Sequence, residues 1–244
     1  MYEQPATTPP MNDVGDSFGW PFRDPEWVSK ILLQGLINII PIAGQMALLG
    51  WLLGAVDNLR QGRSELLPAG FNNFARGAIL WLVAFVYGIV ITIVALILMV
   101  IGLAASGGDQ HAPVYGVFQL LQNLWSLVAD IALGLAFPTI VLLTDREGIG
   151  GGLNVPKVIS TIQLNPGKAL LAGLFAIIAY IISGLGLLLC CVGIIFTAPY
   201  GAAMLAGATF WLERNLPMGP APMVEGPSQP PSMQPPPPPP PAGA

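Results

Sequence analysis

The sequence predicts an all-α fold: a polytopic helical membrane bundle with about six membrane segments. Hydrophobic residues make up 54% of the 244 residues and charged residues only 9%, whereas about a quarter of an ordinary soluble domain is charged. The mean hydropathy is +0.68, and the charges avoid the long apolar stretches. The prolines are segregated, with 13 of the 25 lying between Pro217 and Pro241. A hydrophobic body with polar ends is therefore expected.

Composition also excludes several classes of protein. So apolar a chain does not have the surface of a soluble enzyme. Two cysteines cannot form a disulfide framework, and a net charge of −4 does not supply a surface for nucleic acid. A cleavable signal is not expected, because three acids precede the first base in residues 1–23. Insertion is therefore expected to depend on the spanning segments themselves.

The polar ends and the apolar body divide the chain into three parts. We expect residues 1–23 to form a disordered cytoplasmic N-terminal tail and residues 24–214 to form the helical membrane domain. Residues 215–244 are expected to form a disordered, proline-rich cytoplasmic C-terminal tail, because this composition cannot bury a core.

The number of spans follows from the lengths of four apolar blocks. About 20 apolar residues suffice to cross a bilayer. As continuous helices, residues 28–59 and 169–212 would measure about 48 Å and 66 Å, too long for single spans. Turns are expected near Pro41 and at Cys190–Cys191, although residues 28–60 could also form one bent helix or a re-entrant segment. The six expected segments are 28–40 (short), 43–60, 76–103, 115–143, 168–189 and 193–213.

The basic residues support six segments. With the N-terminus in the cytoplasm, all nine Lys and Arg residues fall on the cytoplasmic side, as expected for short loops of a membrane protein. With four segments, Arg23, Lys30 and Arg214 would lie outside. Both tails are therefore expected in the cytoplasm of a prokaryotic cell, with the body in its cytoplasmic (inner) membrane.

Local signals indicate where helices begin. Asp24-Pro25-Glu26 and Asn165-Pro166 each combine a capping side chain with a proline suited to the first turn. Residues 154–164 and 67–76 place apolar side chains on one helical face. We expect two short cytoplasmic interfacial helices there, with ordinary loops as the alternative.

Three stretches of sequence carry a resemblance to a known family. These are the D-P-E-W start and I-P-I-A-G turn within residues 18–62, the segment LPAGFNNFARG, and the N-P-G-K entry to the fifth segment. Residues 18–214 thereby resemble the prokaryotic membrane-protein family called domain of unknown function 4013. The resemblance implies a polytopic bundle in the cytoplasmic membrane and no particular activity. Family members usually place acidic and tryptophan residues after the L-P motif, where residues 69–73 here read AGFNN.

An intramembrane polar stripe is the sharpest candidate site. Asp130 is the one ionisable residue deep inside a span, and no Lys or Arg lies at its depth. A carboxyl group there is expensive unless it is protonated or hydrogen-bonded. Gln34 and Asn38 on the first segment could face the stripe and supply such bonds, while interhelical bonding is the ordinary role of amides in membranes. The stripe itself, spaced by four, three and four residues, comprises Gln119, Asn123, Ser126 and Asp130.

The other polar residues indicate less. The charges of residues 57–60 and 145–147 are expected to be solvated helix ends. No catalytic constellation, cofactor motif or metal site is expected, because the single histidine, His111, has only Asp109 near it in sequence. Gly50 and Gly54 have the small-xxx-small spacing of close helix contacts, either within the bundle or between copies. Ala203 and Gly207 have the same spacing.

The C-terminal tail contains a run of seven prolines that favours polyproline II conformation. A plain spacer is the simplest role. The alternative is docking in an aromatic-lined groove of a cytoplasmic partner. The run comprises Pro235, Pro236, Pro237, Pro238, Pro239, Pro240 and Pro241.

These observations favour a non-enzymatic membrane scaffold or accessory subunit. Its expected partners are the lipid bilayer, other membrane proteins or further copies of the chain, and a polyproline-binding protein, with no nucleic acid. The alternative is a small transporter or channel in which the stripe around Asp130 carries protons or a small solute.

Overall fold

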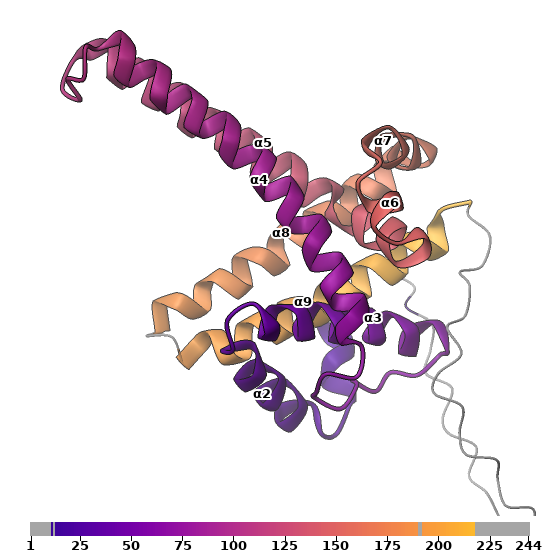
Figure 1. Cartoon of the computed structure of the whole chain (residues 1–244). Coiled ribbons are helices and arrows are strands. Elements are labelled where there is room, and N and C mark those ends of the chain that lie inside the picture. The colour runs from indigo at the N-terminus through magenta and orange to yellow at the C-terminus, as the bar shows by residue number, and fades with distance from the viewer. Residues whose placement is uncertain (1–10, 12, 190–191, 218–244) are drawn as a thin grey trace, which may run out of the picture.

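The computed structural model describes residues 11, 13–189 and 192–217, and every regular element among them is helical, as Figure 1 shows. The all-α class is therefore confirmed. The elements in chain order are α1 (Asp16–Gly19), η1 (Trp20–Arg23), α2 (Trp27–Asn38), α3 (Ala43–Arg60), α4 (Phe74–Ala105), α5 (Pro113–Glu147), α6 (Ile149–Gly152), α7 (Val155–Leu164), α8 (Pro166–Leu185), η2 (Gly186–Leu189) and α9 (Val192–Asn215).

Four helices of the described chain are long and apolar enough to cross a membrane: α4, α5, α8 with η2, and α9. They coincide with the four longest predicted segments. Residues 28–60 form two helices joined at residues 39–42, not one bent helix. With 12 residues, α2 is about 18 Å long, too short to span by itself. The structure thus supports four spanning helices, which is fewer than the six segments expected.

Helix α9 lies at the centre of the bundle. It contacts α2, α3, α5 and α8, and residues 201–213 are buried without interruption. The core around it is built from apolar side chains such as Leu52, Leu53 and Val56 of α3 and the small residues Ala203 and Ala206 of α9. Helices α4 and α5 pack antiparallel and project as a long hairpin away from this core (Figure 1).

Residues 13–23 fold against α9, although the sequence places them in a disordered tail. Trp20 is fully buried, and its indole Nε1 donates a hydrogen bond to the Ala203 carbonyl at 3.1 Å. A Cβ atom at Gly207 would lie 2.9 Å from the same Nε1, so the small residues of α9 make room for the ring. The Ala203 and Gly207 pair therefore faces Trp20 and the short helix α1, whose Ser17 Cβ would lie 3.0 Å from a Cβ atom at Gly207.

Two predicted interfacial helices have different outcomes. Helix α7 forms at residues 155–164 as expected, and Asn154 Oδ1 accepts from the Lys157 amide at 3.1 Å. The prediction of a helix at residues 67–76 is wrong, because residues 63–73 contain no helix and α4 begins only at Phe74. Contacts with other parts of the chain keep this segment non-helical. The Trp51 indole donates to the Leu67 carbonyl at 3.0 Å, and Pro68 has no amide hydrogen to donate to a helical hydrogen bond.

The residues 63–73 are also tied to α2 through Asp24. This carboxylate is 1% exposed. Its Oδ2 accepts from Lys30 Nζ and from the Leu66 amide, and its Oδ1 accepts from the Glu26 amide, each at 2.8 Å. Burial alone would raise the pKa of Asp24, but the bonds from Lys30 and the two amides outweigh it and hold the pKa below its ordinary value.

Because the pKa of Asp24 is lower in the folded chain than in the unfolded one, its stabilising effect is present above the unfolded pKa of about 3.9. That effect is lost as the pH falls through the folded value. We expect Asp24→Asn to lower the free energy of unfolding by about 1–3 kcal/mol at pH 7, and the difference from wild type to shrink below about pH 4. Unfolding in detergent between pH 3 and pH 7 measures this. Asp109→Asn, in the turn between α4 and α5, is the control, and a pH-independent difference for Asp24→Asn contradicts the prediction.

Candidate functional site

Four helices meet at a group of charged side chains, which we call the arginine–carboxylate cluster. Its members come from α3, α4, α5 and α9, and their side chains are between 5% and 23% exposed. Three arginines face three carboxylates, so the cluster is electrically balanced. The members are Asp57, Arg60, Arg76, Asp145, Arg146 and Glu213.

Arg60 is the hub of the cluster. Its Nη1 donates to Asp57 Oδ1 at 2.9 Å and to Asp145 Oδ2 at 2.8 Å. Its Nε and Nη2 bind the two oxygens of Glu213 at 2.8 and 3.2 Å, which is the bidentate geometry that a guanidinium group favours. One side chain thereby joins α3 to α5 and α9.

The remaining bonds close the cluster. Arg76, from the first turn of α4, donates to Asp57 at 2.5 Å and to Asp145 at 2.6 Å. Arg146 donates to Glu213 at 2.7 Å. Each carboxylate is thus shared by two arginines, and the beginning of α4 is fixed to the ends of α3, α5 and α9.

The sequence did not predict this cluster. The charges of residues 57–60 and 145–147 were expected to be solvated helix ends, and Arg76 and Glu213 carry no sequence signal of their own. The partners in the cluster are far apart in the chain: Arg60 and Glu213 are 153 residues apart. The signal that could have found them is the low charge content. In a chain with so few charges, opposite charges at the same ends of several spans are expected to pair.

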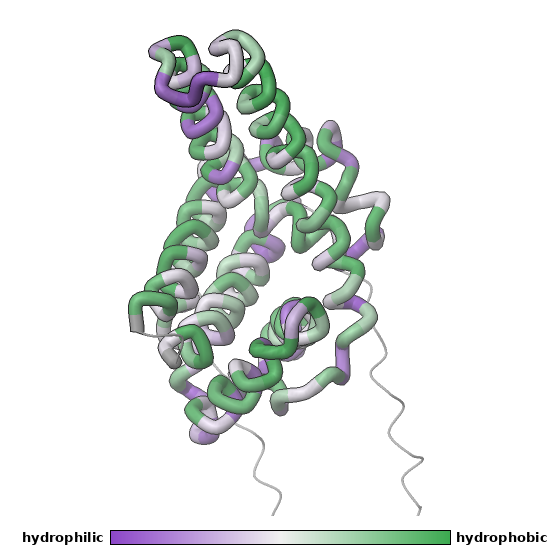
Figure 2. Tube along the Cα trace, turned by 60° about the vertical axis from the view of Figure 1, so that its left-hand side comes forward, coloured by the Kyte–Doolittle hydropathy of each residue, from purple (hydrophilic) through white to green (hydrophobic). Residues whose placement is uncertain are grey.

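The predicted polar stripe lies on the projecting hairpin. Gln119, Asn123 and Asp130 are exposed on α5 and Ser126 is half-buried. The apolar side chains between them are exposed as well, including Leu120 at 68% and Leu127 at 58%. Figure 2 shows that the hairpin is largely hydrophobic along its length, with hydrophilic residues interspersed and gathered at its tip.

The facing helix α4 is equally uncovered. In its most apolar window of 18 residues, none is buried. The two helices hold each other through contacts such as the bond from the Trp125 indole to the Ile91 carbonyl at 3.1 Å. The outer half of the hairpin therefore offers a long apolar surface with a few polar groups on it.

Gln34 and Asn38 lie elsewhere. Gln34 is fully buried, and its Oε1 accepts from the Gly70 amide at 3.0 Å, so it organises the segment before α4. No described hydrogen bond joins Gln34 or Asn38 to Asp130. Gln34 Nε2 and Asn38 Oδ1 are buried without a partner among the described residues. The structure thus does not bring Gln34 and Asn38 into hydrogen-bonding contact with the polar stripe of α5.

The other expectations concern metals and the tail. Among the described residues no group of three His, Cys, Asp or Glu side chains is placed to hold a metal ion. The run Pro235–Pro241 and the pair Cys190–Cys191 lie outside the described residues.

An all-helical bundle with four helices long and apolar enough to cross a bilayer belongs to the class of multi-pass membrane proteins. A family model described as protein of unknown function (DUF4013) matches residues 33–192, which is more than half of the chain, and the chain belongs to that family. Comparison with curated proteins and with solved structures finds no match.

Proposed function

We propose that this protein is a non-enzymatic membrane scaffold or accessory subunit whose α4–α5 hairpin binds another membrane protein. The observation that carries the proposal is the exposure of Gln119, Asn123 and Asp130 on the hairpin surface. A carboxyl group at the middle of a lipid-facing helix costs about 2.5–3.5 kcal/mol on insertion scales. A partner that supplies hydrogen-bonding groups removes most of that cost.

The depth of Asp130 supports this argument. It lies 17 residues from Pro113 and 15 residues from Asp145 on one continuous helix, or about 25 Å and 22 Å along the axis. With Asp145 at one surface of a hydrocarbon core about 30 Å thick, Asp130 lies about 22 Å into it, so its carboxyl group falls inside the core. The amides of Gln119 and Asn123 both donate and accept, so they suit a polar partner face, where each bond contributes on the order of 1 kcal/mol.

The arginine–carboxylate cluster supplies the rigid base that a scaffold needs. Arg76 joins the start of α4 to Asp145 near the end of α5, and Arg60 joins Asp145 to Glu213 of the buried helix α9. The hairpin therefore projects from a defined position, and a partner bound to it would be held in a fixed orientation.

The same cluster supports the proposed orientation in a prokaryotic cytoplasmic membrane. Arg60, Arg76 and Arg146 meet in it, and Lys157 binds the adjacent Glu147 at 2.6 Å. Bases on one side favour the cytoplasm, so we propose that both termini lie there. Helices α2 and α3 would complete six segments as a short hairpin entering from the same side.

Site-directed photo-crosslinking in native membranes tests the proposal. We expect a crosslinker at Leu120 to give a discrete protein adduct, and Asp130→Leu to reduce its yield several-fold by removing the polar contact. A crosslinker at Tyr180, which is 81% exposed on α8, is the matched control and should give no adduct that depends on Asp130. Equal yields at both sites, or a yield unchanged by Asp130→Leu, would rule out the docking face. A transporter function predicts instead that Asp130→Leu abolishes transport without changing the adduct.

A further inference from the structure

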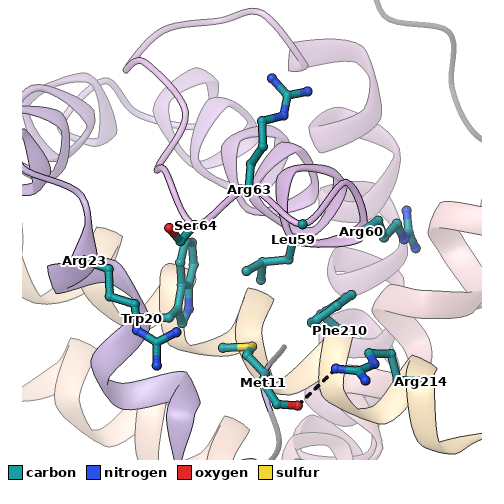
Figure 3. A pocket seen from close by; sticks show the side chains of 10 residues that line it. Met11, Trp20, Arg23, Leu59, Arg60, Arg63, Ser64, Phe210 and Arg214 are labelled. Atoms are coloured by element: carbon teal, nitrogen blue, oxygen red, sulfur yellow. Dashed lines mark hydrogen bonds between the residues drawn. The ribbon is translucent and has the colours of Figure 1, made fainter. Parts of the chain in front are cut away.

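A pocket of about 220 Å³ lies beside the arginine–carboxylate cluster. It is formed by the N-terminal segment, the end of α3, residues 62–64 and the last turns of α9. Figure 3 shows four apolar side chains around its centre, all of them at most 9% exposed: Met11, Trp20, Leu59 and Phe210. For comparison, an apolar cavity of about 150 Å³ holds a benzene molecule.

Four arginines also line this pocket. The guanidinium group of Arg60 belongs to the cluster and is satisfied by carboxylates. The other three stand at the rim, where Arg23 and Arg214 approach from opposite sides and Arg63 points outward (Figure 3).

Among the described residues, the three rim arginines have no carboxylate partner closer than 3.9 Å. No described residue forms an ion pair with Arg63 or Arg214, and Arg214 Nη1 donates only to the Met11 carbonyl, at 3.1 Å. The ion pair of Arg23 with Asp16 is long, at 3.9 Å, between side chains that are about one-third exposed. Thus, within the part of the chain that the structure describes, the cluster balances its own charge, whereas no close carboxylate balances the three rim arginines of the pocket.

We infer that this pocket binds a phosphate group that carries an apolar extension. Guanidinium groups bind phosphate oxygens through paired, charge-assisted hydrogen bonds. The apolar walls between Trp20, Leu59 and Phe210 accommodate the carbon portion next to the phosphate. The volume suits a headgroup region and not a whole lipid, so the acyl chains of a phospholipid would remain in the bilayer.

Two sources can provide this chemistry. One is the headgroup of an anionic phospholipid, because basic pockets at the cytoplasmic ends of spanning helices match such groups. The other is a free phosphate compound. The apolar wall favours the lipid, since inorganic phosphate has nothing to place against Trp20.

The test uses the full chain, purified in uncharged detergent. Bound ligand is counted by native mass spectrometry and by the shift in Tm. The probes are dihexanoyl phosphatidylglycerol, dihexanoyl phosphatidylcholine and inorganic phosphate. The variant combines Arg23→Gln with Arg214→Gln, and the matched control combines Lys157→Gln with Lys168→Gln, which removes the same charge elsewhere.

We expect wild type and control to bind phosphatidylglycerol, and the arginine variant to bind it roughly tenfold or more weakly for lack of two charge-assisted contacts. If inorganic phosphate binds as tightly, the site is for phosphate but the source is soluble. Equal binding of phosphatidylcholine, or an arginine variant that binds like the control, overturns the inference. Arg23→Gln alone, at an exposed side chain whose ion pair with Asp16 is 3.9 Å long, is the second variant if the first does not fold. It should bind phosphatidylglycerol several-fold more weakly than the control, and equal binding overturns the inference.

Discussion

Arg60→Gln is expected to lower the free energy of unfolding by about 3–5 kcal/mol, because removing one partner of a buried ion pair leaves the others uncompensated. Arg60 contacts Asp57, Asp145 and Glu213, and the last two side chains are only 5% and 9% exposed. Without Arg60, three carboxylates share two arginines. Glutamine keeps some hydrogen bonding but not the charge. Unfolding by SDS in mixed micelles measures the loss.

Arg63→Gln provides the matched control, three residues further along the chain. Arg63 is exposed and forms no described ion pair, so this change is expected to alter the free energy of unfolding by no more than about 0.5 kcal/mol. Both variants lose one positive charge at the C-terminal end of α3. If the two lost equal stability, the cluster would be no more than a set of surface charges.

The Arg60 result also bears on the proposed function. If the cluster holds the hairpin in place, Arg60→Gln should broaden the set of sites that crosslink from Leu120, even where the protein stays in the membrane. The hairpin itself would persist, because α4 and α5 pack on each other through contacts such as Trp125 with Ile91.

Length and hydropathy correctly predicted the four helices that are long and apolar enough to cross a membrane. Each of α4, α5, α8 and α9 was predicted by an apolar run whose helical length exceeds the thickness of the hydrocarbon core. The start of α8 was predicted by the capping residue Asn165, whose Oδ1 accepts from the Lys168 amide at 3.4 Å. These signals are local, so a single sequence contains them.

The features that were missed depend on contacts between distant residues. The Trp20 indole is held in place by its hydrogen bond to the Ala203 carbonyl. Residues 63–73 are kept non-helical by hydrogen bonds to the side chains of Trp51 and Gln34. No local pattern distinguishes such a segment from a short amphipathic helix. Similarly, the spacing of Gln119, Asn123 and Asp130 predicts that they share a face of α5, but whether that face is covered depends on the path of every other helix.

Gly77→Ala is expected to give the second large effect, a loss of about 3 kcal/mol or more in the free energy of unfolding. This is at or above the upper end of the cost of adding a methyl group to a well-packed core. A Cβ atom at Gly77 would lie 1.9 Å from the Met46 carbonyl oxygen and 2.4 Å from the Gly50 amide nitrogen. Both are backbone atoms, so no side-chain rotation relieves the clash. Helices α3 and α4 would have to separate.

Gly88→Ala tests whether that loss comes from the close approach of the two helices. Gly88 lies in the same helix, and a Cβ atom there meets nothing within 4 Å, so alanine should be neutral or stabilising by up to about 1 kcal/mol through helix propensity. A Gly77→Ala protein as stable as Gly88→Ala would mean that α3 and α4 do not touch. Since Arg76 precedes Gly77 and binds Asp57 of α3, separating these helices should also weaken the arginine–carboxylate cluster. The losses from Gly77→Ala and Arg60→Gln are therefore expected to be less than additive in the double variant.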